Sequence, residues 1–247
     1  MRACLAAKAQ KRLPYKAALT GALVSCLLMG CEWGPSSKIR YRLTVVIDTG
    51  SQRQSRSTII EVKTTKHLST GDYPNFVRRV TGDAVSFKVG SRHVYAILYN
   101  EDRRHDYIGH LVAAAVARGQ FSESLRHQLS GETWLAREAL LRRAKPTIWL
   151  STKDYPMLVR FRDEADPATV EEVPSTWKNN DPSKIRVVAA AISIVNDAPR
   201  LTLSKELPWL QAWKTRRVRL NGKDGPVFTN ELSDQLDASN FEQGGAQ

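Results

Sequence analysis

The sequence predicts an α+β protein in which a mainly antiparallel sheet is flanked by two or three helices. Four segments with strand patterning follow one another between residues 40 and 99, and no helical segment separates them. Helical periodicity begins only after residue 106. Consecutive strands without crossover helices favour antiparallel pairing, because parallel neighbours need a long connection.

The first two predicted strands form a hairpin. In the segment 40–48 every second residue is apolar, which predicts a half-buried strand. The residues on its apolar face are Tyr41, Leu43, Val45 and Ile47. A polar loop over 49–55 leads to a second alternating run over 56–66. The buried residues of this run are Ile60 and Val62, or their neighbour Ile59.

A second hairpin is predicted after a surface loop over 67–83 that contains two glycines and a proline. Val85, Phe87 and Val89 alternate with polar residues, and a β-rich run over 94–99 follows the turn residues Gly90 and Ser91.

Two helices are predicted next. Apolar residues recur at three and four positions from Ile108 to Val116, with Gly119 as a stop signal. A second helix lies within 132–144, ends before Pro146, and is expected to dock on the sheet.

The rest of the chain supplies strands and one short helix. Strands are predicted over 148–150, 157–161 and 185–195, the last buried on both faces and therefore central. Residues 207–213 favour a short helix.

The N-terminus has the layout of a signal peptide. Residues 1–16 contain five basic and no acidic residues, and the run from Ala17 to Gly30 has no charge. This run has 14 residues, whereas a membrane-spanning helix needs about 20. An uncleaved signal anchor is the alternative interpretation.

Leu28-Met29-Gly30-Cys31 ends this run and resembles the lipobox of bacterial lipoproteins. The resemblance implies that Cys31 is lipidated and becomes the mature N-terminus in the bacterial cell envelope, facing the periplasm. Cys26 in Leu23-Val24-Ser25-Cys26 is an alternative, but it would leave an apolar start to the mature chain. The sequence does not distinguish the inner from the outer membrane.

Four regions follow from these patterns: a lipoprotein signal peptide (1–30), a short tether (31–39), a single α+β domain (40–222) and a loop-rich C-terminal tail (223–247). Removal of residues 1–30 lowers the formal net charge from +12 to +7. The basic surface favours an anionic lipid or glycan, or another envelope protein, as a partner. Nucleic acid is not expected, because no helix-turn-helix, zinc or aromatic-platform motif is present.

Asp48-Thr49-Gly50-Ser51 follows three apolar residues and resembles the active-site signature of aspartic peptidases. Such enzymes use two facing carboxylates that share a proton, so a second chain would have to supply the other Asp48. Tyr107-Ile108-Gly109 resembles the apolar-apolar-Gly element of that family. The family's preceding hairpin is missing here, and turn chemistry that closes a hairpin is the preferred interpretation of Asp48.

No metal or cofactor site is predicted, since the five histidines lack ligand spacing and the three cysteines, Cys4, Cys26 and Cys31, all lie near the N-terminus. An acidic group offers oxygen ligands for calcium: Asp163, Glu164, Asp166, Glu171 and Glu172. Asp166-Pro167 is interpreted instead as a helix cap.

Two aromatic residues stand out near the C-terminus. Trp209 and Trp213 lie one helical turn apart beside the basic stretch 214–219, and core packing is favoured over docking at a membrane interface.

The stretches 155–163 and 166–170, with Leu207-Pro208-Trp209-Leu210, resemble uncharacterised proteobacterial lipoproteins, a resemblance that implies no activity. The sequence therefore predicts a lipid-anchored cell-envelope protein with a non-catalytic binding or accessory role. The alternative is a membrane-tethered homodimeric aspartic peptidase that uses Asp48. An envelope inhibitor or immunity-type lipoprotein is not separated from the first hypothesis.

Overall fold

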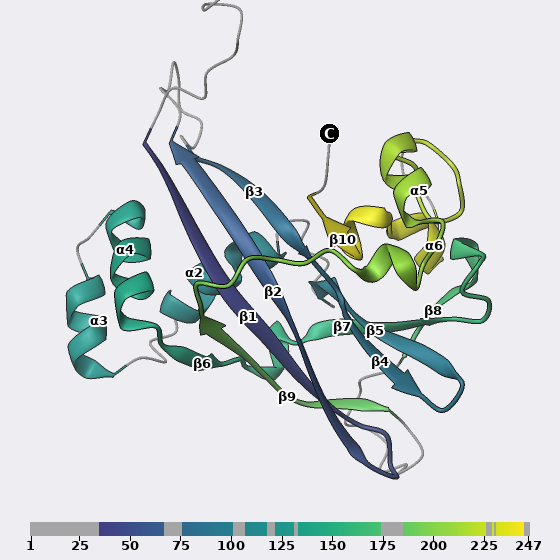
Figure 1. The fold of residues 1–247 in the computed structure, drawn as a ribbon, viewed down its shortest axis with the longest axis horizontal. Coiled ribbons are helices and arrows are strands. Elements are labelled where there is room, and N and C mark those ends of the chain that lie inside the picture. The colour runs from purple at the N-terminus through teal and green to yellow at the C-terminus, as the bar shows by residue number, and fades with distance from the viewer. Residues whose placement is uncertain are drawn as a thin grey trace, which may run out of the picture.

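The computed structural model describes residues 35–66, 76–100, 107–117, 122–130, 133–173, 185–225, 229 and 231–244. Within these ranges the chain forms ten strands in two antiparallel sheets, with helices on their faces (Figure 1). The predicted α+β class is confirmed.

The main sheet has six strands in the order β10-β3-β2-β1-β9-β6. Their bounds are β1 (Ser36–Asp48), β2 (Arg53–Lys66), β3 (Phe76–Asp83), β6 (Thr147–Trp149), β9 (Arg186–Ile194) and β10 (Glu242–Gln243). The first predicted hairpin is confirmed, because β1 pairs with β2 from Ser36↔Thr65 to Asp48↔Arg53. The predicted face of β1 is completely buried, and Ile60 and Val62 are its buried neighbours on β2.

The second sheet has the order β4-β5-β7-β8. Its strands are β4 (Val85–Val89), β5 (Arg92–Asn100), β7 (Pro156–Phe161) and β8 (Val170–Glu172). The second predicted hairpin is confirmed, but it belongs to this separate sheet. The predicted antiparallel strands are therefore divided between two sheets. Ala84 separates β3 from β4 and lets the chain leave one sheet and enter the other.

Five α-helices accompany the sheets in the described part of the chain. They are α2 (Tyr107–Ala117), α3 (Glu123–Leu129), α4 (Trp134–Ala144), α5 (Leu210–Arg216) and α6 (Leu232–Gln235). The predicted helices over 108–116 and 132–144 are confirmed as α2 and α4. The short polar α3 was not predicted, and its start is capped by the Ser122 hydroxyl, which accepts from Leu125 N. No helix in the described part of the chain has the length and apolar composition needed to cross a bilayer.

Two cores lie on opposite faces of the second sheet. Val94, Ala96 and Leu98 of β5 face the main sheet, in the first core. The alternate residues of the same strand lie in the second core: Tyr95, Ile97 and Tyr99. Alternate side chains of a strand point to opposite faces. Because both faces of β5 are covered, its sequence is one continuous apolar run.

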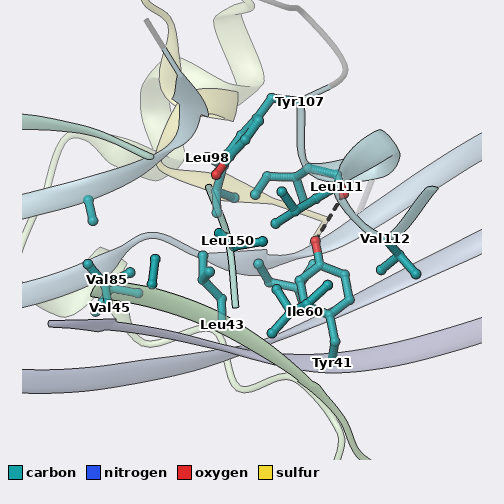
Figure 2. Packing of buried hydrophobic residues seen from close by; sticks show 14 of the residues in the cluster. Tyr41, Leu43, Val45, Ile60, Val85, Leu98, Tyr107, Leu111, Val112 and Leu150 are labelled. Carbon is teal, nitrogen blue, oxygen red and sulfur yellow. Dashed lines mark hydrogen bonds between the residues drawn. The ribbon is translucent and has the colours of Figure 1, made fainter. Parts of the chain in front are cut away.

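The first core is closed by α2. Figure 2 shows Leu111 and Val112 of α2 above Tyr41, Leu43 and Ile60 of the main sheet. The Tyr41 hydroxyl donates to the carbonyl oxygen of Ile108 at 2.9 Å, which satisfies a buried polar group at this contact.

Three predicted boundaries differ from the structure. Residues 36–39 of the predicted tether are the first residues of β1, and residues 76–83 of the predicted loop form β3. The tail predicted after residue 222 contains α6, a 3-10 turn and β10, and it packs into the second core through Leu236, Ala238 and Phe241. Short segments with few apolar residues carry little periodicity, so their order comes from tertiary contacts.

Candidate functional site

The C-terminal cavity is a hollow of about 900 Å³ between β3, α5 and the last described residues of the chain. It is lined by Arg79, Val80, Thr81, Gln211, Trp213, Lys214, Thr215, Arg217, Val218, Asp237, Ala238, Ser239, Glu242, Gln243 and Gly244. Its size is within the range of small-molecule binding sites.

One wall of the C-terminal cavity is held in place by the second core. Phe241 is fully buried and lies edge-on to the rings of Tyr95 and Trp209. The amide of Ala84 donates to the carbonyl oxygen of Phe241, and the next residue, Glu242, pairs with Asp83 in the β10–β3 ladder. Burial of one aromatic ring thus positions the carboxylate that follows it.

The facing wall is α5. Gln211, Lys214 and Thr215 are three and four residues apart, so they share one face of this helix. The residue that caps the C-terminal end of α5 is Arg217, which adopts a left-handed backbone conformation (φ 56°) and also lines the cavity.

Glu242 is the chemical centre of the C-terminal cavity. Its side chain is completely buried. Oε1 accepts from Lys214 Nζ at 2.7 Å and from Gln211 Nε2 at 3.0 Å, and Lys214 also donates to the carbonyl oxygen of Gly244. Oε2 has no hydrogen-bond partner, although most buried polar atoms have one. No part of Glu242 is exposed, so this oxygen is closed off from the cavity by the residues around it.

A second buried carboxyl lies opposite Glu242. Asp83 is its cross-strand partner, and Oδ2 of Asp83 accepts from the amides of Thr202 and Leu203 at 2.5 and 3.2 Å. Burial raises the pKa of Asp83, and the negative charge of the neighbouring Glu242 raises it further. The hydrogen bonds from the two amides lower this pKa, but the net shift is upward. Oδ1 of Asp83 has no hydrogen-bond partner.

The cavity lining carries more positive than negative charge. Arg79, Lys214 and Arg217 are its cations, whereas Asp237 and Glu242 are its anions. Both anions already have cationic partners, since Asp237 lies 3.5 Å from Arg219 and Glu242 lies 2.7 Å from Lys214. Among the described lining residues there is no histidine or cysteine. This arrangement suits the binding of an anion.

Asp48 is the last residue of β1, at the turn that leads to β2, and it does not line the C-terminal cavity. Its Oδ1 accepts from Gly50 N at 2.9 Å, and Thr49 N donates to the carbonyl oxygen of Gln52. Its Oδ2 lies 3.3 Å from Arg186 and 3.9 Å from Arg53. These hydrogen bonds are those of a hairpin-closing turn, as in the preferred interpretation of Asp48-Thr49-Gly50.

The electrostatics of Asp48 are those of an ion-paired carboxylate. The hydrogen bond from Gly50, together with Arg186 and Arg53, lowers its pKa despite partial desolvation. A peptidase dyad needs a carboxyl that retains a shared proton, and the two guanidinium groups oppose this.

The acidic group at 163–172 is partnered within the protein. Asp166 Oδ1 accepts from Ala168 N at 3.0 Å and caps the 3-10 turn Pro167–Thr169, which confirms the cap interpretation. Glu164 accepts from His93, and Glu171 lies 3.2 Å from Arg160. No group of three or more potential metal ligands occurs in the described ranges.

The two tryptophans belong to the protein interior, as core packing predicts. Trp209 is buried and donates from Nε1 to the carbonyl oxygen of Glu164, while Trp213 packs against it and donates to the carbonyl oxygen of Arg219. Trp213 also borders the C-terminal cavity.

The sequence singled out part of this site and missed the rest. The dense basic stretch 214–219, which the sequence analysis noted, contains the lining residues Lys214 and Arg217. Glu242, Gln211 and Arg79 were missed, because they are 31 residues or more from one another in the chain and share no motif. Cys31, the predicted lipidation site, lies outside the described residues.

Comparisons with known proteins add no assignment: no family model, no curated protein and no solved structure matches the chain.

Proposed function

We propose that this protein is a lipid-anchored component of the bacterial cell envelope that binds an anionic ligand without catalysing a reaction. The leader and Leu28-Met29-Gly30-Cys31 support the anchor and the periplasmic location. The C-terminal cavity supports the binding role.

The observation that carries the binding role is the set of cations that line the C-terminal cavity. Arg79, Lys214 and Arg217 line one cavity, and guanidinium groups bind carboxylate and phosphate oxygens with paired hydrogen bonds. A ligand with a phosphate or carboxylate group matches this cationic lining.

A binding role suits this site better than a catalytic one. Glu242 is held by Lys214 and Gln211, so its charge is neutralised and its orientation is restrained. A general base works when it is free to take a proton and lies near a nucleophile. The carboxylate here is committed to contacts within the protein.

Calorimetry on the full-length chain tests the binding role, with glycerol 3-phosphate and glucuronate as probes. Arg217→Gln should weaken binding of the better probe by about tenfold or more, since a hydrogen bond to a charged group contributes about 1.5–3 kcal/mol. Arg216→Gln is the matched control, because Arg216 is the preceding residue and does not line the cavity. The absence of binding by either probe, or equal losses in both variants, would contradict the proposed site.

A further inference from the structure

The first part of β2 has a neighbouring strand on one side only. β1 pairs with β2 along almost its whole length, whereas β3 pairs only with residues 61–66 on the other side. β3 ends its pairing near Gly82, where an added Cβ would lie 3.2 Å from the carbonyl oxygen of Ile59. Residues 53–58 of β2 are therefore at an edge of the main sheet.

The register of the sheet shows which backbone groups face this edge. Successive residues of a strand direct their N–H and C=O groups to opposite neighbours. Lys66 N donates to the carbonyl oxygen of Pro35 on the β1 side, so Thr58 also bonds towards β1. Ser55 and Ser57 direct their N–H and C=O groups to the edge, and both residues are exposed. In the described ranges they form no backbone hydrogen bond on that side.

A groove of about 460 Å³ lies beside this edge, and we call it the edge groove. β2 contributes Arg56, Ser57 and Thr58 to its lining, and the segment after β9 contributes Arg200 and Thr202. Its volume is within the range of ligand-binding sites. A strand edge with unpaired N–H and C=O groups is a template for pairing with another chain.

The charges of the edge groove favour an acidic ligand. Its cations are Arg42, Arg56 and Arg200, and its anions are Asp83 and Glu206. Both anions already accept hydrogen bonds within the protein, and Arg42 is ion-paired with an aspartate outside the groove. Arg56 and Arg200 are exposed and have no ion pair or hydrogen bond in the part of the chain that the structure describes. Charged side chains at an edge discourage unspecific strand pairing, and guanidinium groups bind carboxylates.

We propose that β2 accepts an extended acidic segment of a partner protein as an additional strand in the edge groove. The backbone of the segment pairs with Ser55 and Ser57, since a peptide backbone offers donors and acceptors at the spacing of a strand. Its carboxylates bind Arg56 and Arg200. The edge groove shares no lining residue with the C-terminal cavity, so this inference does not depend on the proposed function.

Hydrogen exchange of the full-length chain, followed by NMR, tests the pairing residue by residue. In the free protein the amides of Ser55 and Ser57 should exchange rapidly, and the amide of Thr58 should exchange slowly because it is bonded to β1. The probe is a pool of capped hexapeptides in which valine alternates with glutamate. At saturation it should slow the two serine amides about tenfold or more and leave Thr58 unchanged.

Three control ligands separate strand pairing from anion binding. A matched pool with glutamine in place of glutamate should bind at least about tenfold more weakly, because hydrogen bonds to a charged group are lost. The glutamate pool with N-methylated backbone amides should not slow the exchange of Ser55 or Ser57, and glutamate alone should not slow it either. Protection by glutamate alone or by the N-methylated pool would indicate a site for small anions and would overturn the inference.

Variants of the two free arginines test the charge requirement. Arg56→Gln/Arg200→Gln should weaken binding of the glutamate pool by at least about tenfold. Arg142→Gln/Arg143→Gln removes the same charge from α4, which does not line the edge groove, and should bind as the wild type does. Equal affinities of the two double variants would contradict the role of the groove.

A pair of proline variants tests the assignment of the edge. Proline lacks the N–H group and is tolerated in a strand where that group faces away from the sheet. Ser57→Pro should therefore keep a urea midpoint near that of the wild type but lose the protection of Ser55 by the glutamate pool. Thr58→Pro removes a bond between β1 and β2 and should lower the urea midpoint clearly. Equal losses of stability in both variants, or no protection of the wild type by the glutamate pool, would overturn the inference.

Discussion

At the scale of single residues, the carboxyl groups of Asp48 and Asp83 have pKa values shifted in opposite directions. Asp48 is held ionised by Arg186, Arg53 and the amide of Gly50. Asp83 is buried, and its pKa is raised by burial and by Glu242. The two residues are therefore expected to respond differently to substitution by asparagine and to pH.

Asp48→Asn should fold normally, because an asparagine oxygen can accept the same hydrogen bond from Gly50 and tolerates turn geometry. The urea midpoint at neutral pH should shift much less than after a core truncation. Peptide-library cleavage between about pH 3 and 8 should show no pepstatin-sensitive activity in the wild type. Cleavage that is present in the wild type and lost in Asp48→Asn would instead support the homodimeric peptidase.

Asp83→Asn should make the protein more resistant to urea at neutral pH. A carboxyl whose folded pKa is raised contributes full stability below its unfolded pKa and loses that contribution as the pH rises through the folded value. Asparagine keeps an acceptor for the amides of Thr202 and Leu203 and carries no charge to repel Glu242. Urea midpoints measured upward from about pH 4 should fall less steeply in Asp83→Asn than in the wild type. Parallel curves would contradict the raised pKa.

At the scale of elements, the last described strand depends on a single aromatic anchor. β10 has two residues and one short ladder to β3, which is too little pairing to order a strand by itself. Phe241 immediately before it packs against Tyr95, Phe161 and Trp209. The C-terminal segment is therefore part of the second core.

Phe241→Ala should lower the free energy of unfolding by about 3–5 kcal/mol, the usual range for truncation of a fully buried aromatic ring. It should also abolish ligand binding in the C-terminal cavity, since Glu242 would lose its position. Denaturant titration and calorimetry measure the two effects. Gln243→Ala, two residues further on and half-buried, should change stability by no more than about 0.5 kcal/mol. Equal effects of the two substitutions would contradict the anchoring role.

At the scale of the whole molecule, two sheets and a C-terminal segment are held together by two apolar cores. The first core lies between the sheets, and the second lies between the second sheet and residues 203–241. Hydrophobic burial is the dominant stabilising contribution in such an arrangement. The three cysteines all lie before residue 32, so they cannot link these layers to one another.

The melting temperature of the full-length protein should not change with reductant or with a metal chelator. All three cysteines precede residue 32, so no disulfide joins the elements of the two cores, and the acidic group at 163–172 is engaged in hydrogen bonds and ion pairs within the protein. Differential scanning calorimetry with and without each reagent measures this. A clear decrease with chelator alone would instead support a calcium site at Asp163–Asp166.

Mass spectrometry of the protein from its native membrane should find an acylated N-terminal Cys31. This expectation follows from the charged leader, the short apolar run and Leu28-Met29-Gly30-Cys31. Replacement of Cys31 by serine should leave an unprocessed, unacylated chain, whereas Cys26→Ser should not affect acylation. Acylation at Cys26, or an intact Met1, would exclude the predicted site.

The sequence by itself determined the parts of this protein that local patterns encode. Alternation defined β1, the β4–β5 hairpin and the inward face of Tyr41, Leu43, Val45 and Ile47, because a half-buried strand must repeat every second residue. Turn chemistry placed Asp48 in the hairpin, and helical spacing defined α2 and α4.

Only the tertiary structure decided which strands share a sheet and where the C-terminal cavity forms. β4 and β5 are as apolar as a strand of the main sheet, and their separation depends on how the chain packs after Ala84. The cavity joins Arg79, Lys214 and Glu242 from three distant segments. Burial of Phe241 brings them together, and no local pattern in a sequence records a contact between residues that far apart.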